Sequence, residues 1–286
     1  MRRIFIITAA LLLSFPAFAQ ESASPIPTGS NEPLEITADK SLEWHRTEKQ
    51  FIARVNTLAK QGPTSIASDL LIADYRETAQ SSMDIYKVTA EGSNVLITSQ
   101  ETTATGQKAI YNLDKGYAEM TGNNLKLVSP DQTVTARDRF EYWITAGKLV
   151  AIGQAKVVRL EDTLEAEQVS AVFTEDAKGQ RVLKSLEADS NVVITTPTEV
   201  LTGDKATYNA ETNLADLVGN VKIKRGPNIL EGDKAQVNLT TNVSTMYGGG
   251  SNGQVRGIFY PNSEKNPGGS SSGLMDAMPT PDKMTP

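Results

Sequence analysis

The sequence predicts an all-β protein in which antiparallel strands are stacked along one axis. Three observations predict this class. A small residue followed by an acidic or amide residue recurs about every 30 positions, apolar and polar residues alternate between these recurrences, and no long segment combines a helical period with helix caps. A repeat of this length is typical of a solenoid, in which each unit packs on its neighbours.

The first 19 residues are predicted to be a cleaved signal peptide. Two arginines precede an apolar run over 4–15, and Ala17-Phe18-Ala19 is a small-residue cleavage site. The run is shorter than the roughly 20 apolar residues that span a bilayer. We therefore expect a soluble, exported protein located in the periplasm, with a disordered linker at 20–33.

Residues 34–261 carry the internal repeats, in two blocks at about 34–145 and 146–261. At an offset of 97 residues the run 93–98 (SNVLIT) matches 190–195 (SNVVIT), and the alignment continues without a gap. Because such matches share a register over dozens of positions, chance is a poor explanation for them.

The repeated element marks a place where the chain changes face. Leu201 and Gly203 share one parity, whereas Ala206 and Tyr208 share the other. Glycine allows a corner or bulge there, and Asp204 can hydrogen-bond its own backbone. The element occurs at Ala38-Asp39-Lys40, Ser68-Asp69-Leu70, Gly106-Gln107-Lys108, Ala166-Glu167-Gln168, Gly203-Asp204-Lys205 and Gly232-Asp233-Lys234, with a degenerate copy around Ala136-Arg137-Asp138.

The composition changes towards the C-terminus. Residues 262–286 are rich in Gly, Ser and Pro and are predicted to form a disordered tail, while the apolar island at 255–261 is a candidate last strand. In a stack of this kind the first and last strands keep unpaired backbone groups unless a partner covers them.

The side-chain inventory excludes several chemistries. The chain has no cysteine and one histidine, which excludes disulfides, cysteine-ligated metals and multi-histidine sites. We expect His45 to have a surface or packing role, and the protein to have no cofactor, no metal and no enzymatic activity. The 34 acidic residues against 28 basic ones argue against a nucleic-acid partner.

Three segments resemble a known family. The runs 203–208 (GDKATY), 219–223 (GNVKI) and 230–235 (LEGDKA) are similar to the OstA/LptA repeat of lipopolysaccharide-transport proteins, and 253–261 resembles the closing segment of LptA-type proteins. The resemblance covers about 34–261. It implies an open β-jellyroll, V-shaped in section, with an apolar interior that holds lipid A acyl chains.

The resemblance also implies partners. LptA-type proteins bridge an inner-membrane LptC-like protein and an outer-membrane LptD-like protein by pairing the edge strands of their jellyrolls, and they self-associate head to tail. The cleavable leader and the lack of any later barrel sequence favour the LptA-type bridge, with lipopolysaccharide as ligand. From the inward parity we predict these groove-lining residues: Val95, Ile97, Tyr111, Met120, Leu125, Phe140, Val157, Phe173, Val192, Ile194, Tyr208, Leu217, Val221, Ile223 and Val237.

Two alternatives remain at this point. One is a structural scaffold or adhesin whose solenoid has a closed, dry core, because periodicity does not reveal whether the sheets splay apart. The other is a carbohydrate-active enzyme that uses the acidic group Glu161, Asp162, Glu165 and Glu167. Alternation places Asp162 on the opposite face from the three glutamates, so a solvated outer face explains this group better.

Overall fold

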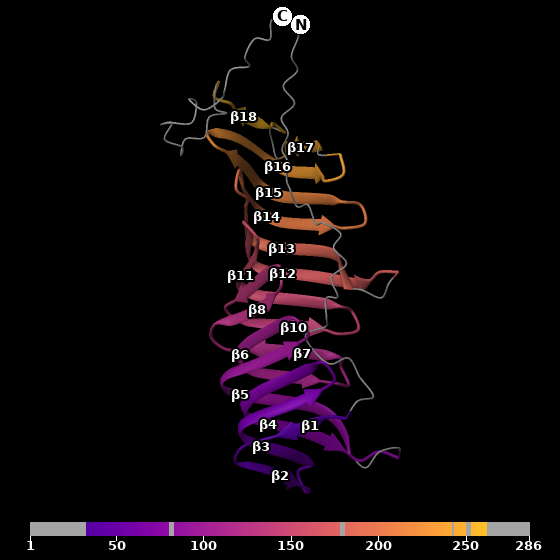
Figure 1. Cartoon of the computed structure of the whole chain (residues 1–286). Helices are drawn as coiled ribbons and strands as arrows, with labels where there is room; N and C mark the ends of the chain where they lie inside the picture. Colours follow the sequence, from indigo (N-terminus) through magenta and orange to yellow (C-terminus); the bar gives the residue numbers. More distant parts are fainter. Residues whose placement is uncertain (1–32, 80–82, 178–180, 242, 250–252, 262–286) are drawn as a thin grey trace, which may run out of the picture.

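The computed structural model describes an elongated stack of strands (Figure 1). The described residues are 33–79, 83–177, 181–241, 243–249 and 253–261. The predicted signal peptide, the linker up to residue 32 and the predicted tail lie outside them. No helix in the described part of the chain has the length and apolarity to span a membrane.

All strand pairings are antiparallel, and nearly all join strands that are close in the sequence. The all-β class is therefore confirmed. The strands are β1 (Glu35–Thr37), β2 (Ser41–His45), β3 (Gln50–Gln61), β4 (Thr64–Arg76), β5 (Asp84–Ser99), β6 (Thr102–Asn112), β7 (Tyr117–Thr121), β8 (Leu125–Ser129), β9 (Gln132–Ala136), β10 (Arg139–Trp143), β11 (Lys148–Arg159), β12 (Asp162–Glu175), β13 (Arg181–Thr195), β14 (Val200–Asn209), β15 (Leu214–Arg225), β16 (Asn228–Asn238), β17 (Val243–Tyr247) and β18 (Arg256–Ile258).

Most strands bend once, and the bend divides each of them between two limbs. In the pairing of β4 with β5, the register shifts between Ala67 and Leu70. Equivalent shifts interrupt the pairings of β11 with β12, β13 with β14 and β15 with β16. Because these shifts recur at the same point of successive strands, the bends form a continuous corner along the stack.

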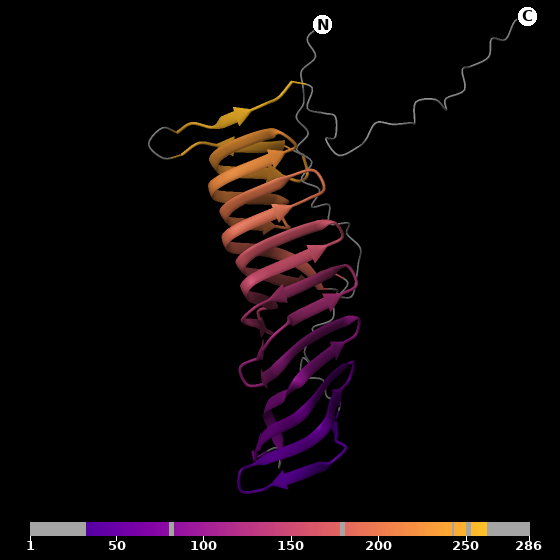
Figure 2. The same cartoon turned by 90° about the vertical axis from the view of Figure 1, so that its left-hand side faces the viewer.

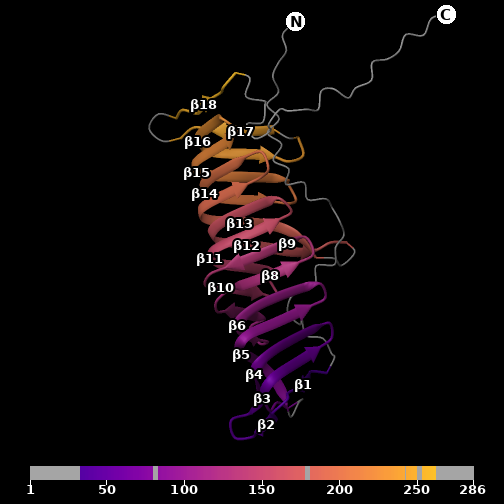
Figure 3. The ribbon, with the colours of Figure 1, turned by 60° about the vertical axis from the view of Figure 1, so that its left-hand side comes forward.

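We call the two sides of the corner the first limb and the second limb. The first limb contains β2, β7, β10, β17 and the halves of the bent strands that pair with them; the second contains β1, β8, β9, β18 and the other halves. Where the structure describes them, the hairpin turns lie within one limb, and the links from β1 to β2, β7 to β8 and β9 to β10 join the limbs at the corner. The opposite side, where the turns of both limbs end, is the mouth (Figures 2 and 3).

Acidic and amide side chains hold the corner together. The backbone N–H of Ser93 donates to the Asp69 carboxylate at 2.8 Å, and that of Asn123 donates to Gln107 at 3.1 Å. The side-chain amide of Asn220 donates to Asp204 at 2.9 Å. The expectation that Asp204 bonds its own backbone is wrong, because its partner lies on the bend of the next strand.

At most bends the partner strand has a left-handed backbone. Gly153 and Gly219 have φ values of 86° and 80°, and a Cβ on Gly219 would lie 2.2 Å from Asp204 Oδ2. Gly203 has a different role from the one predicted. Its backbone is not left-handed, but a Cβ there would lie 2.7 Å from Leu217 Cδ1, so a small residue is needed inside the bend.

The first bend shows that glycine is not indispensable. Val55 and Asn56 occupy the positions of Gly219 and Asn220 and have φ values of 66° and 47°. Asn56 donates to Asp39 at 2.7 Å, as Asn220 does to Asp204. The N-terminal unit, whose sequence matches the repeat less well, therefore has the same corner.

The inner faces of the limbs form one apolar core that runs the length of the stack. Leu71, Val95, Leu125, Val192 and Val221 are its largest fully buried side chains. Removing apolar surface from water contributes roughly 25 cal/mol per Å², so this core is the main stabilising term. The predicted change of face is confirmed, since β14 buries positions 201 and 203 before its bend and 206 and 208 after it.

Each end of the stack presents two edge strands. β1 and β2 pair only with β3, and β17 and β18 pair only with β16. Their outer backbone groups have no strand partner among the described residues. Such edges are templates for pairing with another chain.

Candidate functional site

The predicted lining residues lie in the interior between the limbs. Ten of them belong to the buried core, and Val157, Ile194 and Ile223 pack against it while partly exposed. Tyr208 is also buried, at 7% exposure. Phe173 is half-buried and lies beyond a register shift in the pairing of β12 with β13. The ten core members are Val95, Ile97, Tyr111, Met120, Leu125, Phe140, Val192, Leu217, Val221 and Val237.

Two adjoining cavities open this interior in the first half of the stack. The deeper one, of about 40 Å³, lies between the limbs beneath β7 and β10, and among its lining residues are Met120, Phe140 and Leu127. The other, of about 360 Å³, lies between the turns of the two limbs at the mouth. Ile66, Val88 and Tyr111 line both cavities, so the larger continues into the smaller.

The two limbs have different surfaces towards this space. The second-limb residues that face the deeper cavity are small or aliphatic, namely Ile66, Ile97, Ala104 and Leu127, whereas Gln61 and Thr64 add polar groups to the cavity at the mouth. Every aromatic residue that lies in a described strand is on the first limb. These residues are Trp44, Phe51, Tyr75, Tyr86, Tyr111, Tyr117, Phe140, Tyr142, Trp143, Phe173, Tyr208 and Tyr247.

Four of these aromatic residues form a row along the mouth. Tyr75, Tyr111, Tyr142 and Tyr208 each lie next to the end of their strand nearest the mouth, and each is at most 9% exposed. The Tyr75 hydroxyl accepts from the Trp44 indole N–H at 2.8 Å, and the Tyr208 hydroxyl donates to Asn213 at 3.2 Å. Tyrosine places a polar tip on an apolar body, so such a row marks a boundary between an apolar space and water.

The hydroxyls of Tyr111 and Tyr208 remain neutral. Burial raises the pKa of Tyr111 and that of Tyr208 above the usual tyrosine value. The Arg181 guanidinium donates to the Tyr142 hydroxyl and lies over its ring, 5.6 Å from the centroid. The mouth side of the first limb is thus lined by neutral phenols and one cation held against them.

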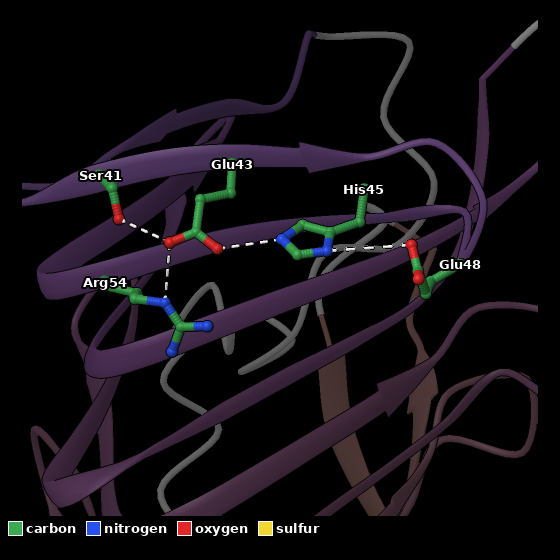
Figure 4. Close-up of polar contacts among 5 residues, drawn as sticks. All are labelled: Ser41, Glu43, His45, Glu48 and Arg54. Atoms are coloured by element: carbon green, nitrogen blue, oxygen red, sulfur yellow. Dashed lines mark hydrogen bonds and ion pairs between the residues drawn. The ribbon is translucent and has the colours of Figure 1, made fainter.

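His45 lies in a polar network on the outer face of the edge strand β2 (Figure 4). Its ring contacts Glu43 at 3.0 Å and Glu48 at 3.8 Å, and its side chain is 38% exposed. Hydrogen bonds from His45 and then from Arg54 and Ser41 lower the pKa of Glu43 to about 2. The network holds the edge strand and faces away from the cavities.

The acidic group on β12 has a different environment from a catalytic pair. Glu165 forms an ion pair with Lys156 at 2.8 Å across the neighbouring strand, and both side chains are exposed. Burial, followed by the proximity of Glu161, raises the pKa of Asp162 above the usual aspartate value. In the described ranges no cluster of three or more metal-ligating side chains occurs.

The lining includes residues beyond those predicted. Leu127 and Tyr142 share the inward parity of the predicted residues Leu125 and Phe140, so alternation identifies them. Ile66 lies on β4, from which no lining residue was predicted, and alternates with exposed or half-buried neighbours there. The position of the mouth could not be predicted from alternation. Which strand ends come together there depends on the bends, and the pattern of single strands does not reveal their direction.

Comparison with known proteins identifies the family of the chain. The family model described as "LptA/(LptD N-terminal domain) LPS transport protein" matches residues 35–148 and again 134–243. No curated protein matches the chain. Among solved structures, the chain is similar to LptH from Pseudomonas aeruginosa, described as the LptA homologous periplasmic component of the lipopolysaccharide transport device. The two are 16% identical with a TM-score of 0.38, over 46% of this chain and 95% of that one. Since the two family matches together span most of the chain, the protein belongs to the LptA/LptD N-terminal domain family of LPS transport proteins.

Proposed function

We propose that this protein is a periplasmic carrier that shields the acyl chains of lipopolysaccharide between its two limbs during passage from the inner to the outer membrane. The observation that carries the proposal is the apolar interior that opens through the mouth, in a chain of a lipopolysaccharide-transport family. The chain acts as a passive path and not as a catalyst.

The binding energy for acyl chains would come from the apolar surface area that binding removes from water. Each buried CH₂ contributes roughly 0.8 kcal/mol, so an acyl chain would bind by apolar contact without an ion pair. The cavity at the mouth is lined by Ile66, Ile85 and Val88 together with polar groups of Gln61 and Thr64. An acyl chain would enter there and extend towards Met120 and Phe140, with its polar head left at the mouth.

The ends of the stack support a second part of the proposal, assembly head to tail. β17 and β18 of one copy would pair with β1 and β2 of the next, or with the jellyroll edges of LptC-like and LptD-like partners, by β-augmentation. Such pairing would join the interiors of successive copies into one path. The leader predicted at 1–19 would deliver the chain to the periplasm.

Photo-crosslinking tests the lipid path. A photoreactive amino acid is placed at Tyr208, which faces the interior, and separately at its neighbour Thr207, and the protein is irradiated with lipopolysaccharide. Thr207 is the matched control because it pairs with Asp216 on the outward parity. We expect adducts at 208 and not at 207. Equal labelling at both positions, or none in a folded protein, would favour a closed scaffold.

Edge pairing has its own test. Proline at Ser244, within the edge strand β17, removes a backbone donor from one end of the stack without reaching the cavities. Light scattering at increasing concentration should show that the wild type grows into longer species and that the Ser244→Pro variant does not. Unchanged growth would remove this end from the proposed assembly.

A further inference from the structure

An aromatic pair with one exposed and one half-buried ring lies outside the mouth on the first limb. Tyr117 at the start of β7 and Trp143 at the end of β10 are direct cross-strand partners, with ring centroids 4.5 Å apart. Trp143 is 43% exposed. Both residues are next to turns at the mouth, and the same two strands cover the deeper cavity on their inner side.

Charged side chains continue this surface one row further from the mouth. Glu119 and Glu141 face each other across the same two strands, an arrangement of like charges that destabilises a sheet. The Tyr117 hydroxyl donates to Glu119 at 2.8 Å, and Arg139 donates to Glu141 at 2.6 Å. We call Tyr117, Glu119, Arg139, Glu141 and Trp143 the rim platform.

Hydrogen-bonding capacity remains on the platform. Each carboxylate uses one oxygen in these described contacts, and among the described residues nothing accepts a hydrogen bond from the Trp143 indole N–H. The other tryptophan differs, since the Trp44 N–H donates to Tyr75. Burial and the bond to Glu119 raise the pKa of Tyr117, so its hydroxyl keeps its proton.

The position of the platform excludes one way of binding. β7 is paired on both sides, with β6 and β10, and β10 is paired with β7 and β11. A peptide therefore cannot add to the sheet here through its backbone. A ligand must bind through side chains alone, on a flat ring with carboxylates and a guanidinium beside it.

We propose that the rim platform is a saccharide-binding subsite. The apolar C–H face of a sugar ring would lie on the exposed Trp143 ring, with the edge of the sugar against Tyr117, whose ring is inclined by 52° to that of Trp143. The sugar hydroxyls would bond Glu119, Glu141 and Arg139. The subsite rests on the proposed function, because it places the sugar of an amphiphile over the rim of the limb that encloses its acyl chains. With this subsite the carrier would recognise the saccharide head group of its ligand as well as the apolar surface of the acyl chains.

Fluorescence isolates this subsite. The chain has two tryptophans, so Trp44→Phe leaves Trp143 as the single reporter. The saccharide released from lipopolysaccharide by removal of its acyl chains is titrated in one arm, and laurate, which has no sugar, in the other. We expect the saccharide to shift the Trp143 emission.

Variants then assign the binding. In a calorimetric titration with the wild-type background, Trp143→Ala should weaken saccharide binding about fivefold and leave laurate binding unchanged, because one stacked ring is worth roughly 1 kcal/mol. Trp143→Phe should restore most of the loss. Tyr247→Ala, which removes another exposed first-limb aromatic residue, is the matched control and should change neither affinity.

The outcomes separate the two proposals. Saccharide binding that is absent in the wild type, or that survives Trp143→Ala, overturns the subsite. Laurate binding in that case leaves the carrier proposal intact. An equal loss of saccharide and laurate binding in Trp143→Ala would show that Trp143 stabilises the interior between the limbs instead of binding sugar. Failure of laurate to bind, with saccharide binding retained at Trp143, would overturn the acyl-chain path and confine the subsite to free saccharide.

Discussion

The two limbs are halves of the same bent strands, yet their surfaces differ. The second limb turns aliphatic side chains such as Ile97 and Leu127 towards the interior, whereas the first limb carries every strand aromatic and the tyrosine row. The limbs have the same strand spacing and the same alternation, so the fold does not require this difference. Under the proposed function, the second limb would contact mainly acyl chains, and the first limb would also contact the boundary with water.

The difference between the limbs depends on a rigid corner that holds them apart. A substitution that disrupts this corner should have the largest effect on the free energy of unfolding. At Gly153 φ is 86°, and a Cβ would lie 2.3 Å from Asp138 Oδ2. We expect Gly153→Ala to lower the free energy of unfolding by about 3 kcal/mol through backbone strain and this clash. Urea unfolding measures it.

The control for this substitution is a glycine with open surroundings. Gly226 is also left-handed, with φ 56°, but a Cβ there would meet nothing within 4 Å. Gly226→Ala should cost only about 1 kcal/mol. Equal costs for the two variants would show that the contact with Asp138 adds nothing to the corner.

The difference between the limbs can be tested directly with two labelled lipids. A photoreactive group on the saccharide of lipopolysaccharide should label the first limb severalfold more than the second, because the tyrosine row and the platform lie there. The same group at the end of an acyl chain should label both limbs. Mass spectrometry of the adducts reads the result, and equal saccharide labelling of the limbs would contradict the assignment.

Two glutamates, one on each limb, should respond to pH with opposite signs. The pKa of Glu43, on the first limb, is lowered to about 2, so its stabilising contribution is present above its unfolded value of 4.5 and is lost as the pH falls towards 2. Glu199, in the turn before β14 on the second limb, is 5% exposed, and burial raises its pKa. Its contribution is present below 4.5 and is lost as the pH rises through the raised value.

Glutamine variants of the two residues test these opposite pH dependences of stability. Relative to the wild type, Glu43→Gln should be destabilised at pH 7 and should approach the wild type near pH 2. Glu199→Gln should match the wild type in acid and be the more stable of the two at pH 7. Thermal unfolding across this range checks both, and parallel profiles would contradict the assigned environments.

The smallest effect is expected at the first bend. Val55 has φ 66°, where a β-branched residue is strained, and its side chain is 45% exposed. Relief of that strain exceeds the entropy that glycine adds to the unfolded chain, so Val55→Gly should stabilise the protein by about 0.5 kcal/mol. A loss of stability in thermal unfolding would show that the valine side chain contributes packing at this corner.

Alternation and repetition predict much of this molecule from its sequence. The change of face in β14 and the burial of Val95, Val192 and Val221 follow from the parity of single strands. The hydrogen bond from the Ser93 N–H to Asp69 does not follow from that parity, because it depends on which bends lie next to each other in the stack. The pairing of Tyr117 with Trp143 is equally hidden, since both lie on the outward parity that single-strand patterns assign to solvent.

The pairing of nearly every strand with its neighbours in sequence has a consequence for how the stack is built. Each hairpin can dock on the one before it as soon as it emerges, so the protein can assemble from its N-terminus while the rest of the chain is still being delivered. Length is then free to vary, because adding a unit extends the corner without changing either end. The two family matches, which overlap at 134–148, fit a chain that became longer by the addition of units.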